Sequence, residues 1–359
     1  METIGDIGEL ALIERLKPFC AADAVGDDAA LMSLRSGHRL VVTTDVLVEG
    51  VHFSDRTTPP YTVGWRSAAA NLSDLAAMGA EAIGITVGLG LPQSTPWPWV
   101  EALYQGMTDC LSAHGAKIYG GDLCRAEQQT VAITALGEVE PQRAIRRDSA
   151  EPDMAVVVTG AHGGSRAGLA VLLEEAVLSE AAVRTSLAEA WVRSHQMPVP
   201  RFDAIAHLKS AIDKSIQNNS ADSIWPTIAG MDSSDGLANA LLQLSHRSQV
   251  GIEVFRADIP LPDGLAETVG YETALNWALY GGEDFELVLC LPHALANALV
   301  EKGATVIGRT VKRTVGTTVE RTTETTVETT PKTTGEVYLL ENEQRSEGKR
   351  ITHNSFQHF

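Results

Sequence analysis

The stretch Asn71-Leu72-Ser73-Asp74-Leu75-Ala76-Ala77-Met78-Gly79-Ala80 lies in an Ala-rich segment and says most about the fold of this chain. Its spacing predicts a helix over residues 61–78, in which Ser67, Asn71 and Asp74 share one face. The small side chains allow such a helix to pack closely against its surroundings. An acidic residue buried there is costly unless it is paired or binds a metal ion. A solvated helix face is the alternative interpretation of Asp74.

Further acidic clusters occur where predicted strands end or predicted helices begin. Each places carboxylates beside Gly, Ser or Thr, and such oxygen atoms are the ligands that Mg²⁺ prefers. Because these ions usually enter proteins with the phosphates of a nucleotide, the pattern predicts phosphate chemistry. Each cluster alone also has a structural explanation, such as an Asx turn or a helix cap. The clusters are Gly26-Asp27-Asp28, Thr43-Thr44-Asp45, Gly120-Gly121-Asp122, Asp232-Ser233-Ser234-Asp235-Gly236 and Gly281-Gly282-Glu283-Asp284.

The clusters differ in how they would present their ligands. Asp45 is expected to end a strand and to present its carboxylate at the edge of the sheet. The paired glycines before Asp122 are expected to form a turn after a strand over 116–119, from which Asp122 reaches a ligand. Ser234 can cap the helix predicted over 237–247, and the N-terminus of that helix can bind phosphate.

The order of the predicted elements indicates an α/β or α+β protein with two domains. In the first half, predicted strands over 29–34, 39–48, 82–90, 116–119 and 129–138 and helices over 61–78 and 97–114 give the order β-β-α-β-α-β-β. The polar stretch from Pro141 to Pro152 predicts the boundary. We therefore expect an N-terminal domain over 1–140 and a C-terminal α/β domain over 153–359.

A Thr/Glu/Val repeat over residues 310–334 interrupts the C-terminal half. It has few residues that could form a core, so it predicts a mobile insertion or an extended ribbon. Because Thr and Val favour strands, a long β-hairpin is the structured alternative.

Charge and cysteine content limit the possible partners. The chain has 28 Lys and Arg against 46 Asp and Glu, a formal net charge of −18, which argues against nucleic acid or an anionic membrane as a partner. The cysteines are widely spaced and suggest neither a zinc site nor a disulfide framework. No signal peptide is recognisable, and no apolar run approaches the ~20 residues that span a bilayer. A reduced, cytoplasmic protein is the default expectation.

Common nucleotide-binding motifs are absent from the sequence. It contains no Gly-x-x-x-x-Gly-Lys-Ser/Thr loop, no Gly-x-Gly-x-x-Gly turn and no protein-kinase signature. The segment Gly160-Ala161-His162-Gly163-Gly164-Ser165 joins a predicted strand to a predicted helix and could cradle a phosphate, although no matching lysine is present. His52 follows the Asp45 strand, and a lone histidine of this kind is more often structural than functional.

Taken in order along the chain, these motifs resemble the thiamine-monophosphate kinase family of the aminoimidazole-ribonucleotide-synthetase-like superfamily. The acidic turns are shared across that superfamily, whereas the string at 71–80 and the context of His52 are similar to this kinase family in particular. The resemblance implies two α/β domains, of which the N-terminal one over 1–140 would bind metal and ATP and form the dimer. The homodimer would be joined through the N-terminal sheets. The resemblance also implies transfer of the γ-phosphoryl group of ATP to thiamine monophosphate.

The resemblance assigns expected roles to individual residues. Asp45, Asp74, Asp122 and Arg147 would carry catalysis. Several Mg²⁺ ions would be held by Asp28, Thr43, Thr44, Asp45, Asp74, Asp122, Asp232 and Asp235. Gly121, Asp122, Arg147 and Ser234 would contact ATP, with Tyr104 at a position that flanks the nucleotide. His52, Glu283 and Phe356 would line the thiamine site.

The implied chemistry agrees with these residue types. The acceptor oxygen belongs to a phosphate that is largely dianionic at pH 7, because its second pKa is ~6. No strong general base is therefore required, and we expect direct transfer without a phosphoenzyme, aided by Mg²⁺ and Arg147. Another ATP-dependent synthetase of the same superfamily is the alternative within the fold. A non-catalytic nucleotide- or metal-binding regulator is the alternative from a different class.

Overall fold

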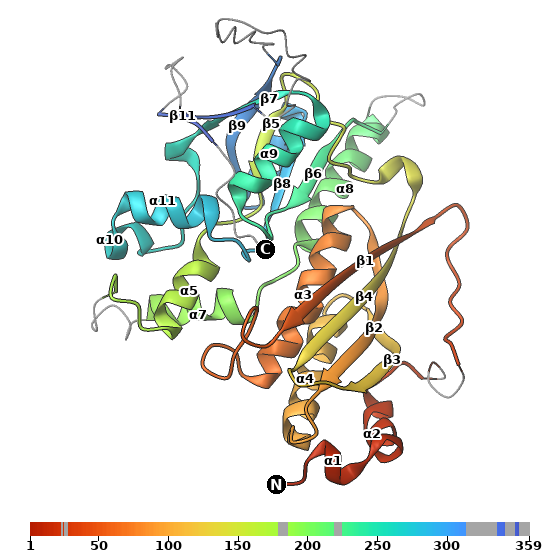
Figure 1. Cartoon of the computed structure of the whole chain (residues 1–359). Helices are drawn as coiled ribbons and strands as arrows, with labels where there is room; N and C mark the ends of the chain where they lie inside the picture. Colours follow the sequence, from red (N-terminus) through yellow and green to blue (C-terminus); the bar gives the residue numbers. More distant parts are fainter. Residues whose placement is uncertain are drawn as a thin grey trace, which may run out of the picture.

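The computed structural model describes residues 1–22, 24, 28–178, 186–218, 225–313, 336–341 and 349–351. Within these residues the strands form a four-stranded sheet in the order β1-β4-β2-β3 and a seven-stranded sheet in the order β11-β10-β7-β9-β5-β8-β6. Figure 1 shows the first sheet below the second, with helix α3 extending from the first toward the second. The predicted mixed α/β class is confirmed.

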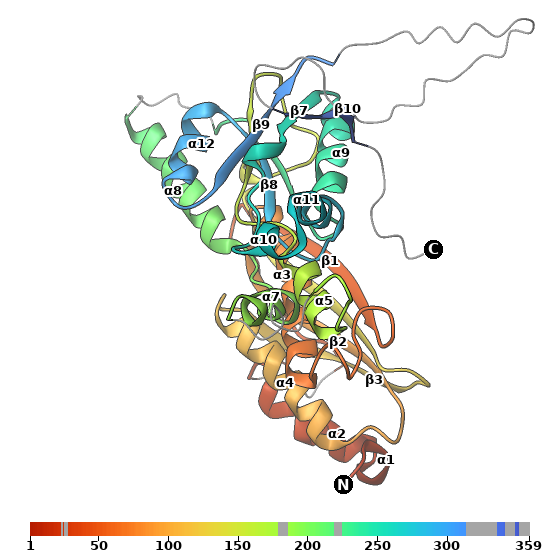
Figure 2. The ribbon, with the colours of Figure 1, turned by 90° about the vertical axis from the view of Figure 1, so that its left-hand side faces the viewer.

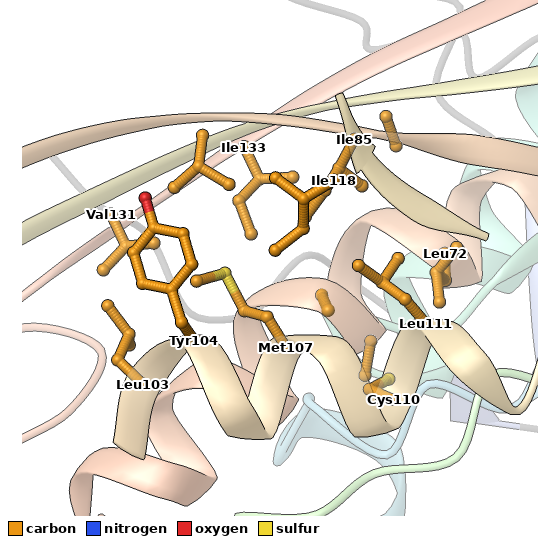
Figure 3. Packing of buried hydrophobic residues seen from close by; sticks show 14 of the residues in the cluster. Leu72, Ile85, Leu103, Tyr104, Met107, Cys110, Leu111, Ile118, Val131 and Ile133 are labelled. Atoms are coloured by element: carbon orange, nitrogen blue, oxygen red, sulfur yellow. The ribbon is translucent and has the colours of Figure 1, made fainter. Parts of the chain in front are cut away.

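Among the described residues, the helices that pack on the first sheet cover one of its faces. β1 and β2 each pair antiparallel with β4, and β2 pairs in parallel with β3. Helices α3 and α4 cover one face, and Figure 3 shows residues of α4 packed against Ile85, Ile118 and Ile133 of the strands. The strands are β1 (Arg39–Val48), β2 (Glu81–Leu91), β3 (Lys117–Arg125) and β4 (Thr130–Val139). The helical segments are α1 (Ile4–Ile7), α2 (Glu9–Leu16), η1 (Lys17–Phe19), α3 (Pro60–Ala77), α4 (Trp97–Ser112) and η2 (Pro141–Arg143).

The second sheet has helices on both faces. Val156 of β5 packs with α9 and α11, whereas Val157 packs with α8 and α12, because successive strand residues point to opposite faces. Figure 2 shows these helix pairs on opposite sides of the strands. The strands are β5 (Ala155–Val158), β6 (Ala229–Asp232), β7 (Gly251–Phe255), β8 (Leu287–Leu291), β9 (Thr305–Val311), β10 (Glu336–Leu340) and β11 (Lys349–Arg350). The helices are α5 (Gly164–Leu172), α7 (Ser186–Gln196), α8 (Phe202–Asn218), α9 (Leu237–Ser248), η3 (Arg256–Asp258), α10 (Leu265–Val269), α11 (Tyr271–Tyr280) and α12 (His293–Val300).

Helix α3 links the two halves. Its residues Ala68, Ala69 and Leu72 belong to the core of the first sheet, whereas Ala76 and Ala77 pack into the core formed by α8 and α12. The Ala-rich composition makes this possible, because small side chains allow close approach on two sides of one helix. The two sheets lie on either side of the predicted boundary at 141–152, and the division into domains stays a prediction.

Several predicted elements differ from the observed ones. Residues 29–34 form no strand, and the fully exposed Leu31 shows that no core covers this segment, so the order in the first half is β-α-β-α-β-β. The strand predicted over 116–119 continues to Arg125. Helix α11 and strand β9 were not predicted as such. Of the Thr-rich repeat, residues 314–334 lie outside the described residues.

In the part of the chain that the structure describes, no helix combines the length and the apolar character needed to cross a lipid bilayer.

Candidate active site

A cavity of about 1200 Å³ lies between the two halves of the chain. Its wall includes Asp45 from β1, Arg66 from α3 and Arg166 from α5. The loop before α9 contributes Asp235, and the loop before β8 contributes Glu283. Because both halves supply polar side chains to one cavity large enough for a drug-sized ligand, it is the candidate active site.

Acidic residues from β1, α3 and β6 meet beside this cavity, whose wall includes Asp45 and Asp235. Asp74 accepts a short hydrogen bond from the Thr43 hydroxyl. Asp232, at the end of β6, accepts hydrogen bonds from the hydroxyl of Ser73 on α3 at 2.8 Å and from the hydroxyl of Ser234 at 3.1 Å. The Ser73 hydroxyl of α3 therefore joins the first half to Asp232 of the second half.

The carboxylates of this cluster are poorly compensated by positive charge. Burial, followed by the charges of Asp74 and Asp235, raises the pKa of Asp45 to about 6. Burial and the charge of Asp74 raise the pKa of Asp232 to about 7. Burial also raises the pKa of Asp74, although the Thr43 hydroxyl and the Arg147 guanidinium oppose this shift. The cluster is therefore strained by mutual repulsion, which a bound cation would relieve.

The described residues contain no group of three or more His, Cys, Asp or Glu side chains placed to hold one ion by themselves. The chemistry of the donor set nevertheless fits Mg²⁺, since it consists of carboxylates and hydroxyls beside a cavity. An ion there would take further oxygen ligands from water or from a phosphate.

The predicted positions of two cluster residues need correction. Asp45 lies within β1 rather than at its end, and its side chain is directed toward α3, where the Asn71 side chain accepts from the Asp45 backbone N–H at 3.1 Å. Ser234 makes no side-chain cap for α9, whose N-cap is Gly236. The Ser234 hydroxyl donates to Asp232 instead.

Gly121 and Asp122 lie away from the cavity of their own chain. They belong to the exposed part of β3, which is the edge strand opposite β1. They are part of a continuous strand rather than a turn. A Cβ atom on Gly121 would lie 1.9 Å from the Val87 carbonyl oxygen, so this glycine is needed for close pairing with β2.

Other predicted site residues have varied positions. Thr44 borders the cavity and shares a hydrogen bond of 2.9 Å with the Thr134 hydroxyl. Asp28 is exposed, and Arg147 is exposed with its Nη1 donating to Gln243 at 2.7 Å. Tyr104 is 5% exposed and lies in the core beside Leu103, Met107 and Val131 (Figure 3), not in the cavity. Phe356 lies outside the described residues.

The cavity wall also includes both described residues that were expected to bind thiamine. His52 lines the wall, and its Nδ1 accepts from the Val48 backbone N–H at 3.1 Å, which places the proton of the neutral ring on Nε2. Glu283 pairs with Arg66 at 2.5 Å. Burial opposes the ionisation of Glu283, but the charge and the hydrogen bond of Arg66 favour it, and the pKa of this carboxyl lies below its usual value.

Sequence reasoning did not identify the arginines and the tryptophan of the cavity wall, Arg66, Arg166 and Trp277. Arg66 lies in the predicted Ala-rich helix, where the cost of burying a guanidinium was an available signal. Arg166 lies 4.7 Å above the Trp277 ring and pairs with Glu175 at 2.8 Å. Its Nη1 is buried and finds no hydrogen-bond partner among the described residues. Arg166 and Trp277 are brought together only by tertiary structure, so no local pattern indicated them.

Asp284 does not share the role of its neighbour Glu283. Its carboxylate accepts from the backbone N–H groups of Gly163 at 2.7 Å and of Ser165 at 2.9 Å. Burial raises the pKa of Asp284 to about 7 against the effect of these hydrogen bonds. The expected phosphate cradle at 160–165 is therefore occupied by a carboxylate of the protein itself.

Comparisons with known proteins identify the family of this chain. Residues 26–139 match the family model for the AIR synthase related protein, N-terminal domain. The thiamine-monophosphate kinase of Synechococcus elongatus is 45% identical over 314 residues, which cover 87% of this chain and 91% of that protein. The crystal structure of thiamine-monophosphate kinase from Stenotrophomonas maltophilia is similar with a TM-score of 0.70 and 32% identity, over 85% of this chain and 95% of that one. The structure of AaThiL complexed with AMPPCP and TMP gives a TM-score of 0.67 and 28% identity, over 98% and 99% of the two chains.

Proposed function

Since the chain belongs to the thiamine-monophosphate kinase family, we infer that it transfers the γ-phosphoryl group of ATP to thiamine monophosphate, giving thiamine diphosphate and ADP. The observation that carries this function is one cavity whose wall includes both the acids Asp45 and Asp235 and the Arg66–Glu283 pair. Such a cavity can hold a molecule whose phosphate and heterocyclic ends differ in chemistry. The TMP and AMPPCP complex of a similar structure supports the same pair of substrates.

We propose that Mg²⁺ is bound where the acids of both halves meet. Asp45, Asp74, Asp232 and Asp235 would hold it with the Thr43 hydroxyl, and the resemblance adds Asp28 and Thr44. The support is the raised pKa of Asp45 and Asp232, which reflects buried carboxylates without enough positive charge. Bound Mg²⁺ supplies the charge that lets two phosphate anions approach and screens the charge that develops during transfer.

The residues of the chain would position the phosphates rather than exchange protons with them. The acceptor phosphate of thiamine monophosphate is already mostly dianionic at pH 7, since its second pKa is ~6. Arg147 lies close enough to lower the pKa of Asp74 and Asp232 and can therefore add positive charge at the phosphates. Ser234, at the cavity wall, is proposed to contact ATP. We propose direct in-line transfer without a phosphoenzyme.

The heterocyclic end of thiamine monophosphate would lie at the Glu283 end of the cavity. The aminopyrimidine ring offers an amino group as donor and ring nitrogens as acceptors. Glu283 is an acceptor at the cavity wall, and Arg166 has a buried Nη1 without a described partner. The walls contributed by His52, Trp277 and Tyr280 would surround the rings. Phe356 remains a predicted contact.

We propose that two copies pair through the open face of the first sheet. On this face Leu40, Val42 and Val46 of β1 are 48%, 54% and 45% exposed, an apolar row that a second copy would cover. The pairing would also explain why Gly121 and Asp122 lie away from their own cavity, because they would complete the site of the other subunit. A cytoplasmic location also stays a prediction.

The experiment that tests the function is incubation of the protein with Mg-ATP and thiamine monophosphate, followed by chromatography for thiamine diphosphate. We expect thiamine diphosphate and ADP in equal amounts. Turnover of ATP with a purine precursor but not with thiamine monophosphate would favour the synthetase alternative. Binding of ATP without any turnover would favour the non-catalytic regulator.

A further inference from the structure

Arg66 of α3 is the centre of a buried polar group that joins three elements. Its side chain is 2% exposed, and its Nη2 donates to Glu283 Oε1 at 2.5 Å. Its Nη1 lies 3.0 Å from Nε2 of His195 on α7 and 3.2 Å from the carbonyl oxygen of the same residue. A guanidinium this well surrounded cannot turn away from its partners without leaving a buried charge unpaired.

These contacts determine the protonation of His195. Because an arginine N–H can only donate, His195 Nε2 must accept, and the proton of the neutral ring is on Nδ1. Nδ1 lies 3.0 Å from the Ser165 hydroxyl and 3.9 Å from Glu283 Oε2. Burial, together with the charge of Arg66, lowers the pKa of His195 to about 3, so the ring is neutral at physiological pH. Its N–H therefore faces the Ser165 hydroxyl and the Glu283 carboxylate.

Glu283 is held at both its backbone and its side chain. Its φ of 58° lies in the left-handed region, and its backbone N–H donates to the Ser234 carbonyl at 2.7 Å. Oε1 is taken by Arg66, whereas no hydrogen bond among the described residues uses Oε2. The side chain is 36% exposed at the cavity wall. One carboxylate oxygen is therefore fixed by the protein, and the other is available to a ligand.

We propose that Arg66 and His195 are positioning residues, which hold Glu283 so that Oε2 accepts a hydrogen bond from the exocyclic amino group of the substrate's aminopyrimidine. This inference rests on the proposed function and adds a basis for specificity. In an analogue with a carbonyl in place of that amino group, the carbonyl oxygen would face Glu283 Oε2, and two acceptors cannot form a hydrogen bond. A site built to pair with a polar group rejects an analogue that lacks it, because its own buried group is then left unpaired.

Arg66 also keeps Glu283 in the acceptor form. Burial opposes the ionisation of Glu283, but the charge and the hydrogen bond of Arg66 favour it, and the pKa of this carboxyl is below its usual value, so it is ionised at neutral pH. Without the guanidinium, burial would dominate and the pKa would rise. A protonated Glu283 could donate a hydrogen bond to a carbonyl. Loss of the Arg66 guanidinium would therefore weaken binding of the amino substrate and strengthen binding of the carbonyl analogue.

The test compares kcat/KM for thiamine monophosphate with kcat/KM for its 4-oxo analogue, oxythiamine monophosphate. Wild type should prefer the amino substrate by ~100-fold or more, as expected for a charged hydrogen bond replaced by repulsion. Arg66→Lys keeps the charge but loses the two-armed geometry, and the preference should fall ~10-fold or more. His195→Gln should lower it by ~2- to 10-fold, the range of a neutral hydrogen bond. KM for ATP should stay unchanged in both variants.

Arg201→Lys provides a matched control. Arg201 forms another inter-element ion pair, with Nη1 2.7 Å from Glu286 Oε2, but neither residue lines the cavity. This variant should lose thermal stability without a change in substrate preference. A double-mutant cycle with Glu283→Gln adds a further readout, since Arg66→Lys should no longer alter the preference in that background.

The outcomes separate the two claims. Wild type that does not phosphorylate thiamine monophosphate refutes the proposed function, and this inference with it. Active wild type whose preference is unchanged by Arg66→Lys and His195→Gln refutes only the inference, because the group would then be merely structural. If Arg66→Lys does not fold, His195→Gln and the Glu283→Gln background decide the result. Equal loss of preference in Arg201→Lys would likewise count against the proposal.

Discussion

Replacing Asp74 by Asn should make the metal-free protein more stable and the enzyme nearly inactive. Asn has the shape of Asp and can still accept from Thr43. It removes one negative charge from the cluster that raises the pKa of Asp45 to about 6. A carboxyl with a raised pKa in the folded state binds a proton more readily there than in the unfolded chain, so its penalty to stability grows as pH rises from ~4 to ~6.

The magnitude follows from that shift. Raising the pKa of Asp45 from 3.8 to about 6 corresponds to ~3 kcal/mol of unfolding free energy lost above pH 6, at ~1.4 kcal/mol per pH unit. Burial is the largest cause, so the charge of Asp74 accounts for less than half, or ~1 kcal/mol. We expect the free energy of unfolding of Asp74→Asn to exceed that of wild type by this amount at pH 7.5 and to approach the wild-type value at pH 4.

The assay is urea unfolding in EDTA across this pH range, with turnover measured separately in Mg-ATP. Turnover of Asp74→Asn should fall by ~100-fold or more, the scale of losing one group that stabilises the transition state. Asp258→Asn, at an exposed position in η3, should change neither quantity. A variant that is less stable than wild type at pH 7.5, or that turns over normally, would refute the view of Asp74 as a member of a repulsive metal-binding cluster.

Further predictions concern the dimer, the edge strand and the loop before β8. If Asp122 serves the site of the other subunit, mixing the inactive variants Asp45→Asn and Asp122→Asn should restore about a quarter of wild-type activity. Half of the dimers are then mixed, and each mixed dimer has one intact site. No recovery of activity after subunit exchange would place Asp122 in the site of its own subunit. Gly121→Ala should lower the melting temperature, because its Cβ would lie 1.9 Å from the Val87 carbonyl oxygen, whereas Gly88→Ala, with its nearest contact at 3.6 Å, should be tolerated. Asp284→Ala should lower the free energy of unfolding in urea by ~2–5 kcal/mol, because it leaves the backbone N–H groups of Gly163 and Ser165 without their acceptor. Asp284→Asn should lower it by less. Equal stability of wild type and both variants would contradict the capping role.

Sequence reasoning worked best where the decisive information was local. The helix around Asp74 was predictable because its small residues and shared face lie within a few turns, and α3 has nearly the predicted bounds. The same helix also contains Arg66, a buried charge whose cost is readable from the sequence. Its partners His195 and Glu283 are distant in the chain, so the purpose of that charge was not readable.

The failures come from long-range order and from single-residue changes of direction. A Gly-Gly-Asp string looks the same on any strand, and only the sheet order places Asp122 at the edge opposite β1. Glu283 and Asp284 are neighbours, yet one faces the cavity and the other caps α5, because the backbone of Glu283 is left-handed. Tyr104 matched a nucleotide position by resemblance, but its place on the inner face of α4 puts it in the core.

A single-turnover experiment with ATP labelled in the γ-phosphate tests the central claim most directly. Excess protein is mixed with labelled ATP, Mg²⁺ and thiamine monophosphate, quenched in acid over time, and separated into protein, thiamine diphosphate and inorganic phosphate. We predict that the label leaves ATP and enters the terminal phosphoryl group of thiamine diphosphate at the same rate, with none on the protein. Label that accumulates on the protein would contradict direct transfer, and label released only as inorganic phosphate would contradict the kinase function itself.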